Sequence, residues 1–467
     1  MAIESINPAT EEVLRRFEEF TSAQTDQALA QVRQTFLEWR TTSFAERAAP
    51  LRAAARYLRD HKGRLAGLIT AEMGKPIVEA EAEIEKCAWN CDFYAENAER
   101  FLADQPVPTN ARESLVAFQP LGVVLAVMPW NFPFWQVFRF AAPALMAGNT
   151  AVLKHASNVP QCALAIEEVF QASGFPAGAF RTLLIGSKAV DAVIGDDRVA
   201  AVTLTGSDVA GSKVAASAGR ALKKHVLELG GSDPFIVLED ADMDGAVKTA
   251  TRARFQNTGQ SCIAAKRFIV IEKVADEFEA RFAEAAQGLR LGDPADRAVQ
   301  IGPLARGDLR DDLHQQVQRS VEQGARLVVG GHPCEGRGYF YAPTVLTAVK
   351  PGMVAFDEET FGPAAAVIRA RDDDEAVRLA NDSKYGLGGN IWTRDTERGK
   401  RLARRLETGN VFINGMTASD PRLPFGGVKH SGYGRELSSF GIHEFTNIQT
   451  IWVGPAQEGA PPKAPSE

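Results

Sequence analysis

The residue types around Cys262 favour a reactive cysteine. The stretch 255–262 is polar and follows a helical pattern, so it offers hydrogen-bond donors and acceptors where a structural cysteine would have apolar neighbours. Gly259 lets the backbone approach a ligand closely, and Lys266 and Arg267 add positive potential. This setting predicts a thiolate, the nucleophilic form of cysteine. The alternative is that Cys262 is a small apolar side chain in a core, the usual place of a free cysteine.

A second candidate group is the carboxyl group of Glu228, which lies in an apolar run just before Gly230 and Gly231. A carboxylate is costly to bury unless it is paired or protonated, so its pKa should be raised. A raised pKa suits a general base near neutral pH. The alternative is a glutamate that faces solvent from an edge strand, because alternation along a strand readily exposes single charges.

Three stretches have residues suited to a dinucleotide, although the G-x-G-x-x-G fingerprint of standard Rossmann domains is missing from the sequence. Gly206 and Ser207 lie where a predicted strand gives way to a helix, and N–H groups there can hold a phosphate. Lys154 ends another predicted strand and can reach ribose or phosphate oxygens. Glu359, in the acidic loop 356–363, can accept hydrogen bonds from both hydroxyls of a ribose. The plainer alternatives are an N-cap serine, a surface lysine and an acidic loop.

The elements that must position these residues follow an α/β pattern. Residues 20–103 are predicted to be helical, and from Gly122 short apolar runs alternate with helical stretches, which is typical of a parallel, doubly wound sheet. A second alternating series follows Gly231. We therefore predict an α/β fold with three parts: a Rossmann-type cofactor-binding domain (1–103 and 121–230), a catalytic α/β domain (231–430) and a small oligomerisation β-element (104–120 and 431–455). Residues 456–467 are predicted to be a disordered tail.

The length, charge and composition of the chain limit the classes of function that it can have. A chain of 467 residues is too long for one core, and its net charge of -7, without basic runs interleaved with aromatics, argues against a nucleic-acid partner. No apolar run approaches the ~18 to 20 residues that span a bilayer, and no signal pattern begins the chain, so we predict no membrane partner and a cytoplasmic location. The five cysteines are scattered, which predicts reduced thiols and no metal site.

Five motifs together resemble the NAD(P)-dependent aldehyde dehydrogenase superfamily. They are P-W-N-F-P at 129–133, L-E-L-G-G at 227–231, N-T-G-Q-S-C at 257–262, E-E-T-F-G-P at 358–363 and P-F-G-G at 424–427. The resemblance implies that Cys262 is the nucleophile, Glu228 the general base, and Asn131 an oxyanion donor together with the Cys262 N–H. It also implies a set of cofactor-site residues: Trp130, Lys154, Gly206, Ser207, Leu229, Glu359 and Phe361.

The implied reaction is the oxidation of an aldehyde to a carboxylic acid. Cys262 would attack the aldehyde carbon, hydride transfer to the nicotinamide would leave a thioester, and water activated by Glu228 would hydrolyse it. One rival is a CoA-acylating aldehyde dehydrogenase, against which Glu228 argues because that branch needs no hydrolytic base. The other rival is a non-catalytic binding protein with the same fold, against which the joint presence of nucleophile, base and oxyanion donor argues.

Within the superfamily, the stretches 135–139 and 415–420 resemble the succinate semialdehyde dehydrogenase branch. Arg139 lies on the helix expected to line the substrate funnel, where a guanidinium can bind a distal carboxylate; the alternative is a salt-bridged structural arginine. Gln256 stands where some members have a second arginine, which leaves glutarate semialdehyde or less polar aldehydes as alternative substrates. The other predicted substrate contacts are Trp135, Ser261 and Ser419.

Ser157 bears on the choice of cofactor. In NAD-preferring relatives a glutamate commonly stands three residues after the ribose-binding lysine, where it repels a 2′-phosphate. Here Ser157 follows Lys154 by three residues. A small neutral hydroxyl should tolerate the phosphate, so we predict NADP as the preferred cofactor, with NAD possible.

The predicted strand at 446–453 needs an edge to pair with, because an unpaired strand exposes its backbone hydrogen-bonding groups. A neighbouring subunit would supply that edge, and the extended segment 113–120 could project as a hairpin. A homodimer or homotetramer is therefore the predicted assembly.

Overall fold

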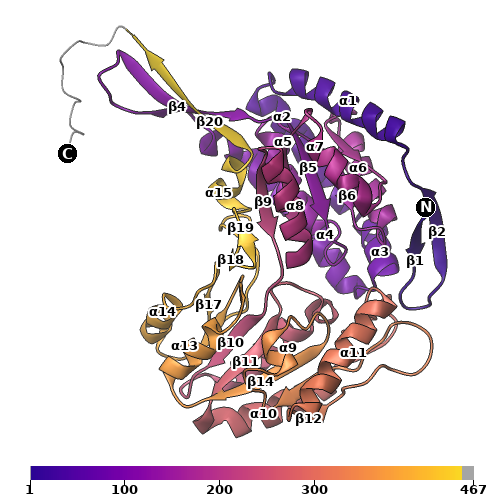
Figure 1. The fold of residues 1–467 in the computed structure, drawn as a ribbon, viewed down its shortest axis with the longest axis vertical. Coiled ribbons are helices and arrows are strands. Elements are labelled where there is room, and N and C mark those ends of the chain that lie inside the picture. Colours follow the sequence, from indigo (N-terminus) through magenta and orange to yellow (C-terminus); the bar gives the residue numbers. More distant parts are fainter. Residues whose placement is uncertain (1, 455–467) are drawn as a thin grey trace.

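We describe residues 2–454 of the protein from a computed structural model (Figure 1). Two sheets, each with its own helices, lie one above the other in this view, and a thin β-arm projects from the upper body. The predicted tail 456–467 and position 455 of the predicted oligomerisation element lie outside the described residues.

The N-terminal region is helical, as predicted for residues 20–103. It forms α1 (Ser22–Trp39), α2 (Phe44–Asp60), α3 (Lys62–Met73) and α4 (Ile77–Phe101). Ser43 begins α2 with a capping box, because its hydroxyl accepts from the Glu46 N–H while the Glu46 carboxylate accepts from the Ser43 N–H. Gly74 ends α3 with a φ of 76°, a left-handed conformation that glycine adopts without a Cβ clash.

The first sheet is the predicted doubly wound one. Its strand order is β19-β9-β8-β5-β6-β7, and every neighbouring pair is parallel except β19 with β9. Its strands are β5 (Val123–Met128), β6 (Thr150–His155), β7 (Phe180–Thr182), β8 (Val199–Thr205), β9 (Lys224–Glu228) and β19 (Gly432–Tyr433). The helices among them are α5 (Trp135–Met146), α6 (Pro160–Ala172), α7 (Val190–Gly195), α8 (Asp208–Arg220) and the short 3-10 helix η1 (Ser187–Ala189).

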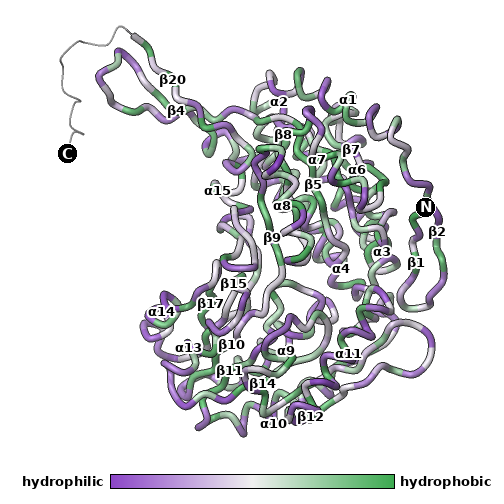
Figure 2. The backbone as a smooth tube through the Cα atoms, viewed as in Figure 1, coloured by the Kyte–Doolittle hydropathy of each residue, from purple (hydrophilic) through white to green (hydrophobic). Residues whose placement is uncertain are grey.

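The position of β5 in this sheet identifies the ligand edge. It lies between β6 and β8, so the chain leaves it first to one side and later to the other. Open α/β sheets bind ligands beyond the carboxyl ends of their strands at such a switch point. Val123, Val124, Leu125 and Ala126 of β5 are fully buried, so both faces of this strand are covered, and Figure 2 colours β5 as hydrophobic.

The second sheet has seven strands in the order β12-β13-β14-β11-β10-β16-β17, all parallel except β12 with β13. The strands β12 and β13 were not predicted, because the first is largely exposed and both are only four residues long. The strands are β10 (Asp233–Val237), β11 (Ala265–Ile271), β12 (Arg326–Val329), β13 (Thr344–Thr347), β14 (Ala364–Ala370), β16 (Asn390–Trp392) and β17 (Phe412–Ile413). The helices are α9 (Met243–Phe255), η2 (Gln256–Gly259), α10 (Glu272–Gln287), α11 (Gly307–Glu322), α12 (Val354–Asp357), α13 (Asp373–Asn381) and α14 (Thr396–Ala403).

The β-arm corrects one expectation. The strand β20 (Thr446–Val453) pairs antiparallel along its whole length with β4 (Glu113–Pro120), to which β3 (Gln105–Pro106) adds. The same chain therefore supplies the edge that we expected from a neighbouring subunit. Exposed side chains on β20 include Ile448, Ile451 and Trp452, and β20 itself is an outer strand of this small sheet.

The predicted oligomerisation segment 431–455 is also divided. Its beginning, β19, joins the first sheet, and α15 (Ser438–His443) packs on α4 and α5. The Tyr94 hydroxyl donates to the Ser438 carbonyl across that contact at 3.0 Å. Two further small sheets pair β1 (Ala2–Ile6) with β2 (Val13–Glu18) and β15 (Tyr385–Gly386) with β18 (Val428–Lys429). Among the residues described, none of the helices is long and apolar enough to cross a membrane.

Candidate active site

The predicted catalytic residues come together at the carboxyl edge of the first sheet. Asn131 follows the end of β5, and Glu228 is the last residue of β9. The segment with Cys262 arrives from the second sheet, between α9 and β11. Asn257 fastens it to the first sheet, since its amide nitrogen donates to the Asn131 carbonyl at 2.9 Å.

The turn that precedes Cys262 has an uncommon backbone. Asn257, Thr258 and Gly259 are all left-handed, with φ of 55°, 55° and 72°. This conformation costs a non-glycine residue about 1–2 kcal/mol, so it needs fixed partners. The Glu79 carboxylate accepts the Asn257 N–H at 2.6 Å, and the Thr258 hydroxyl accepts the Gly302 N–H at 3.0 Å. The chain around the thiol is thus held from α4 and from the loop between α10 and α11.

The state of the Cys262 thiol differs from our expectation of a thiolate. Burial raises the pKa of Cys262 to about 12, although the charges of Arg139 and Lys266 pull in the opposite direction. Loss of hydration penalises the thiolate more than these cations stabilise it. Without a ligand, the site therefore holds a protonated thiol, and the proton must leave as the thiol is used.

The two cationic side chains that follow Cys262 in the sequence have different partners. The Lys266 ammonium donates to the carbonyl oxygens of Ser261 and Cys262 at 2.9 and 3.0 Å. Arg267 is also buried, but it points away and donates to backbone carbonyls, among them that of Ser232 at 3.0 Å. Of the two residues expected to add positive potential, only Lys266 contacts the segment with the thiol.

Asn131 is held in place by its neighbours. Its side-chain nitrogen donates to the Gln260 carbonyl at 3.0 Å, and its side-chain oxygen accepts from the Gln136 amide at 3.1 Å. A carboxamide nitrogen has two hydrogens, so one of them remains available for a ligand oxygen. This geometry is compatible with an oxyanion donor.

A buried ion pair supports the loop that contains Asn131. The Glu83 carboxylate accepts the N–H groups of Phe134 and Trp135 at 2.9 and 3.0 Å, where α5 begins. The Lys75 ammonium pairs with Glu83, and both side chains are fully buried. A negative charge at a helix N-terminus is favourable, and the lysine offsets its desolvation.

Glu228 is buried, with only 2% of its surface exposed, which excludes the solvent-facing alternative. Neither carboxyl oxygen has a hydrogen-bond partner in the described part of the chain. Burial, and next the nearby carboxyl group of Glu436, raise the pKa of Glu228 well above its ordinary value. A raised pKa is what a carboxyl group needs to act as a base near neutral pH.

Arg139 corrects a further prediction. Instead of entering the substrate funnel, its guanidinium forms an ion pair with Glu436, and each side chain is only 3% exposed. It also donates to the Thr205 hydroxyl at 3.3 Å and lies 4.7 Å from the centre of the Phe425 ring. A buried carboxylate is its partner, so the salt-bridged structural arginine is the alternative that the structure favours.

The funnel is a cavity of about 390 Å³ that borders residues on both sides of Cys262. Its wall includes the predicted contacts Trp135, Ser261 and Ser419, but not Arg139. The Ser419 hydroxyl accepts from the Trp135 indole at 3.1 Å. Gln256 and the exposed Arg252 lie at the same wall. Three of the four predicted substrate contacts are thus brought together.

One charged residue of the funnel wall, Lys86, was not predicted; Glu79, Glu83 and Arg252 also line this cavity. The Lys86 ammonium donates to the Ser419 hydroxyl at 2.7 Å and lies 4.4 Å from the centre of the Trp135 ring. It forms no ion pair with any described carboxylate. Burial, and to a lesser extent the charge of Arg139, lower the pKa of Lys86 to about 8. The signal in the sequence was the spacing of Glu79, Glu83 and Lys86, which puts three charges on one face of the helix.

The residues predicted for the cofactor lie at the same sheet edge. Lys154 is half-buried at the end of β6 and has no ion-pair partner among the described residues, and its neighbour Ser157 is exposed. Burial lowers the pKa of Lys154. The Glu359 carboxylate, also half-buried, accepts the Gly231 N–H at 3.1 Å. The free amine of Lys154, the half-buried carboxylate of Glu359 and the neutral Ser157 fit the phosphate and ribose oxygens of a dinucleotide.

The remaining cofactor-site predictions have mixed outcomes. Ser207 caps α8, because its hydroxyl accepts the Ala210 N–H at 3.2 Å, and the Gly206 N–H donates to the Glu228 carbonyl. The plainer capping alternative is therefore present, and Gly206 offers no free N–H to a phosphate. Trp130 and Phe361 meet edge to face with ring centres 5.7 Å apart, and buried Leu229 follows β9.

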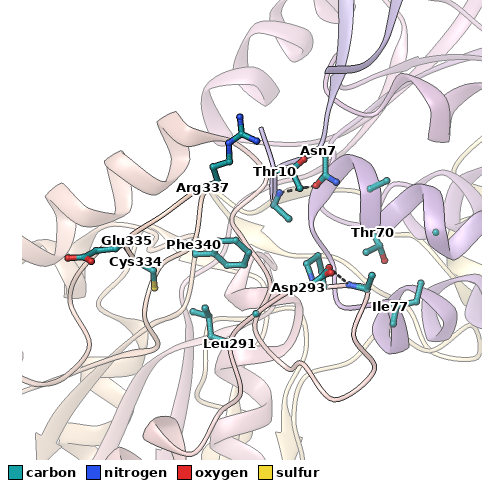
Figure 3. A pocket seen from close by; sticks show the side chains of 16 residues that line it. Asn7, Thr10, Thr70, Ile77, Leu291, Asp293, Cys334, Glu335, Arg337 and Phe340 are labelled. Atoms are coloured by element: carbon teal, nitrogen blue, oxygen red, sulfur yellow. Dashed lines mark hydrogen bonds between the residues drawn. The ribbon is translucent and has the colours of Figure 1, made fainter. Parts of the chain in front are cut away.

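A separate cavity of about 630 Å³ lies away from these residues (Figure 3). It is lined by the turn of the N-terminal hairpin, by α3 and by the loops near Leu291 and Cys334. The Asn7 and Asp293 side-chain oxygens that face it accept N–H groups of their own loops at 2.9 Å. None of the predicted site residues lines this cavity, so we place the chemistry in the smaller funnel. Among the described residues, no group of acidic, histidine or cysteine side chains is arranged to hold a metal ion.

This chain is similar to known proteins in both sequence and structure. Residues 1–451 match the model of the aldehyde dehydrogenase family. A probable NADP-dependent succinate-semialdehyde dehydrogenase of Synechocystis is 53% identical, over 97% of this chain and 100% of the relative. An NADP-dependent succinate-semialdehyde dehydrogenase of Mycobacterium avium is 52% identical, over 98% of each chain. The solved structure of succinic semialdehyde dehydrogenase from Streptococcus pyogenes with NADP+ superposes with a TM-score of 0.95 at 39% identity, over 97% of this chain and 100% of that one. This chain belongs to the aldehyde dehydrogenase family.

Proposed function

We propose that this enzyme oxidises succinate semialdehyde, or a similar short aldehyde with a distal carboxylate, to the acid with NADP. The observation that carries the proposal is Lys86, a half-buried ammonium without an ion-pair partner in the funnel. An aldehyde carbon placed at Cys262 leaves the far end of a short substrate in this cavity. A distal carboxylate there would supply the charge that Lys86 lacks and accept from the Ser419 hydroxyl.

The first step is the attack of the Cys262 sulfur on the aldehyde carbon, in which the thiol proton passes to a water molecule and the carbonyl oxygen becomes an oxyanion. The developing oxyanion accepts from the free N–H of Asn131 and from the Cys262 backbone N–H. Such donors are most effective when they are held in place before the substrate binds. The contacts with Gln260 and Gln136 hold the Asn131 side chain in this way. A nicotinamide cofactor held by Lys154 and Glu359 would supply the hydride acceptor, and loss of hydride from this adduct would leave a thioester.

The last step is hydrolysis of the thioester. Glu228 takes a proton from water, which attacks the thioester carbon and releases the acid and the Cys262 thiol. Burial, and next the carboxyl group of Glu436, raise the pKa of Glu228, and a carboxylate with a higher pKa is a stronger base. Glu436 and Arg139 lie beside it as a charged pair and keep the neighbourhood close to neutral.

The cofactor would be held by Lys154 on the adenosine side and by Glu359 on the nicotinamide side. We propose a preference for NADP because the residue three positions after Lys154 is the neutral, exposed Ser157. A glutamate there would repel the 2′-phosphate. Trp130 and Phe361, in edge-to-face contact, and Leu229 would supply apolar walls.

We also propose a homodimer or homotetramer, supported by the exposed Ile448, Ile451 and Trp452 on the outer strand of the arm. An outer strand with apolar side chains is a surface that proteins usually cover. A cytoplasmic location is proposed from the five unpaired cysteines. Sedimentation at micromolar concentration tests the first proposal, where a monomer would refute it, and cell fractionation tests the second.

An aldehyde panel run with both cofactors tests the function. We expect succinate semialdehyde to give a kcat/KM at least about tenfold above that of an uncharged aldehyde of equal length, since one charge-assisted contact contributes roughly 1.5–3 kcal/mol. Glutarate semialdehyde measures how strictly chain length matters. The product must be free acid, even with CoA present. Equal values for charged and uncharged aldehydes would contradict the carboxylate preference.

A further inference from the structure

Lys266 is a buried cation at the start of β11, and the proposed reaction steps do not use it. Its side chain is fully buried, and its ammonium has three acceptors for its three hydrogens: the carbonyl oxygens of Ser261 and Cys262 and the Glu359 carboxylate, 3.2 Å away. A buried lysine is costly, and burial lowers the pKa of Lys266. A set of contacts this complete indicates that the ammonium fixes the groups around it.

The contact with Ser261 is the informative one. The Ser261 carbonyl and the Cys262 N–H belong to the same peptide group, which is planar. Whatever holds the carbonyl oxygen therefore also sets the direction of the N–H. A hydrogen bond from a cation to the oxygen also polarises the peptide and makes its N–H a stronger donor.

Glu359 connects this peptide to the proposed cofactor site. Its Oε1 atom accepts from both Lys266 and the Gly231 N–H. Gly230 permits this close approach, because a Cβ atom at that position would lie 2.4 Å from the other carboxyl oxygen of Glu359. Glu359, the carboxylate proposed to hold the ribose, thus contacts the turn after β9 directly and the segment of the thiol through Lys266.

We propose that Lys266 is a positioning residue for the oxyanion hole: it holds the Ser261 carbonyl so that the Cys262 N–H points at the developing oxyanion. This inference rests on the proposed role of Cys262. Lys266 touches neither substrate nor reacting atoms, and it acts through the Ser261–Cys262 peptide.

Two reactions of the same thiol test this role. Acylation by p-nitrophenyl acetate forms a bond from sulfur to a carbonyl carbon, develops an oxyanion and releases p-nitrophenolate. Alkylation by iodoacetamide forms a bond from sulfur to carbon, releases iodide and develops no oxyanion. Both need the thiolate equally, so the ratio of the two rate constants isolates the oxyanion hole from changes in thiol pKa. Cys262→Ala must lose both reactions; if it kept them, the proposed nucleophile itself would be wrong.

For Lys266→Met we expect the ratio of acylation to alkylation to fall about 10- to 100-fold, somewhat less than the loss of a whole oxyanion donor. The kcat for aldehyde oxidation should fall by a similar factor, with little change in KM. Lys273→Met, at an exposed lysine of α10, is the matched control and should keep the wild-type ratio. A folded Lys266→Met with an unchanged ratio overturns the proposal. If that variant does not fold, the neutral and shorter Lys266→Gln is read by the same criterion.

Discussion

Lys266 and Lys86 are two amines near the Ser261–Cys262 segment, the first fully buried and the second half-buried. The ammonium of Lys266 has three protein acceptors, two carbonyl oxygens and a carboxylate. The ammonium of Lys86 has a hydroxyl and the face of an indole ring, but no described carboxylate. The amine proposed to position the oxyanion hole is thus paired before any ligand arrives, whereas the amine proposed to bind the substrate is left for the substrate to pair.

The largest effect is expected from a change at the Cys262 thiol, which both regions serve. For Cys262→Ala we expect kcat to fall by at least about 10⁴-fold, because loss of a covalent nucleophile cannot be offset by its neighbours. Binding of NADPH, followed by its fluorescence, should persist, since Lys154 and Glu359 are untouched. Substantial remaining turnover would exclude the thioester route.

Lys86→Met tests substrate recognition separately from the oxyanion hole. We expect KM for succinate semialdehyde to rise about 10- to 100-fold, the equivalent of one charge-assisted contact. The KM for hexanal should stay within about twofold, and Lys188→Met, at an exposed lysine, is the control. Equal changes for both aldehydes would remove Lys86 from substrate recognition.

The same lysine predicts a pH dependence. Only the ammonium form attracts a carboxylate, and the pKa of Lys86 is lowered to about 8. The KM for succinate semialdehyde should therefore be low below pH 8 and rise as the pH increases through it. A bound carboxylate raises the pKa of the amine, so the rise in KM follows the pKa of Lys86 in the free enzyme. In Lys86→Met this rise should be missing, and its persistence there would assign it to another group.

Lys154 extends the comparison to the cofactor, because it is a second amine without an ion-pair partner among the described residues. For Ser157→Glu we expect the ratio of kcat/KM with NADP to that with NAD to fall at least about tenfold, since a carboxylate facing the 2′-phosphate is repulsive. Ser157→Gln is the uncharged control of similar size. A wild-type enzyme that already prefers NAD would contradict the premise.

Arg139→Met should have the smallest effect on selectivity. Its partner is Glu436, so the loss leaves a buried carboxylate unpaired and lowers the free energy of unfolding by about 3–5 kcal/mol. The KM values for succinate semialdehyde and hexanal should change by the same factor, within about twofold. A selective rise for the carboxylate substrate would show that Arg139 leaves Glu436 and enters the funnel when substrate binds.

The sequence was sufficient for the residues whose positions follow from strand ends. Asn131, Glu228 and Lys154 end or follow parallel strands, which all deliver their carboxyl ends to one edge. The direction of a long side chain is a different problem. Arg139 is on the predicted helix, but Glu436, far along the chain, decides where its guanidinium points.

Lys86 was missed for a related reason. A lysine on an amphipathic helix usually faces water, and the helix sequence does not show that Trp135 and Ser419 will cover it. The thiol pKa was misjudged because cations close in sequence are visible while burial is not. Local patterns therefore predicted the elements and their ends, whereas the charge state of the site depends on contacts between distant segments.

The return of β19 to β9 has a consequence for how the protein is made. The strand β9 ends at Glu228, yet its outer neighbour is synthesised about 200 residues later. At the usual pace of translation this delay lasts roughly 10 to 40 s. During that interval the nascent N-terminal body exposes an open strand edge, which is a site for aggregation and for chaperones. The carboxyl group of Glu228 can be enclosed only after residues 426–436 have been synthesised, because Gly426 and Glu436 lie against it.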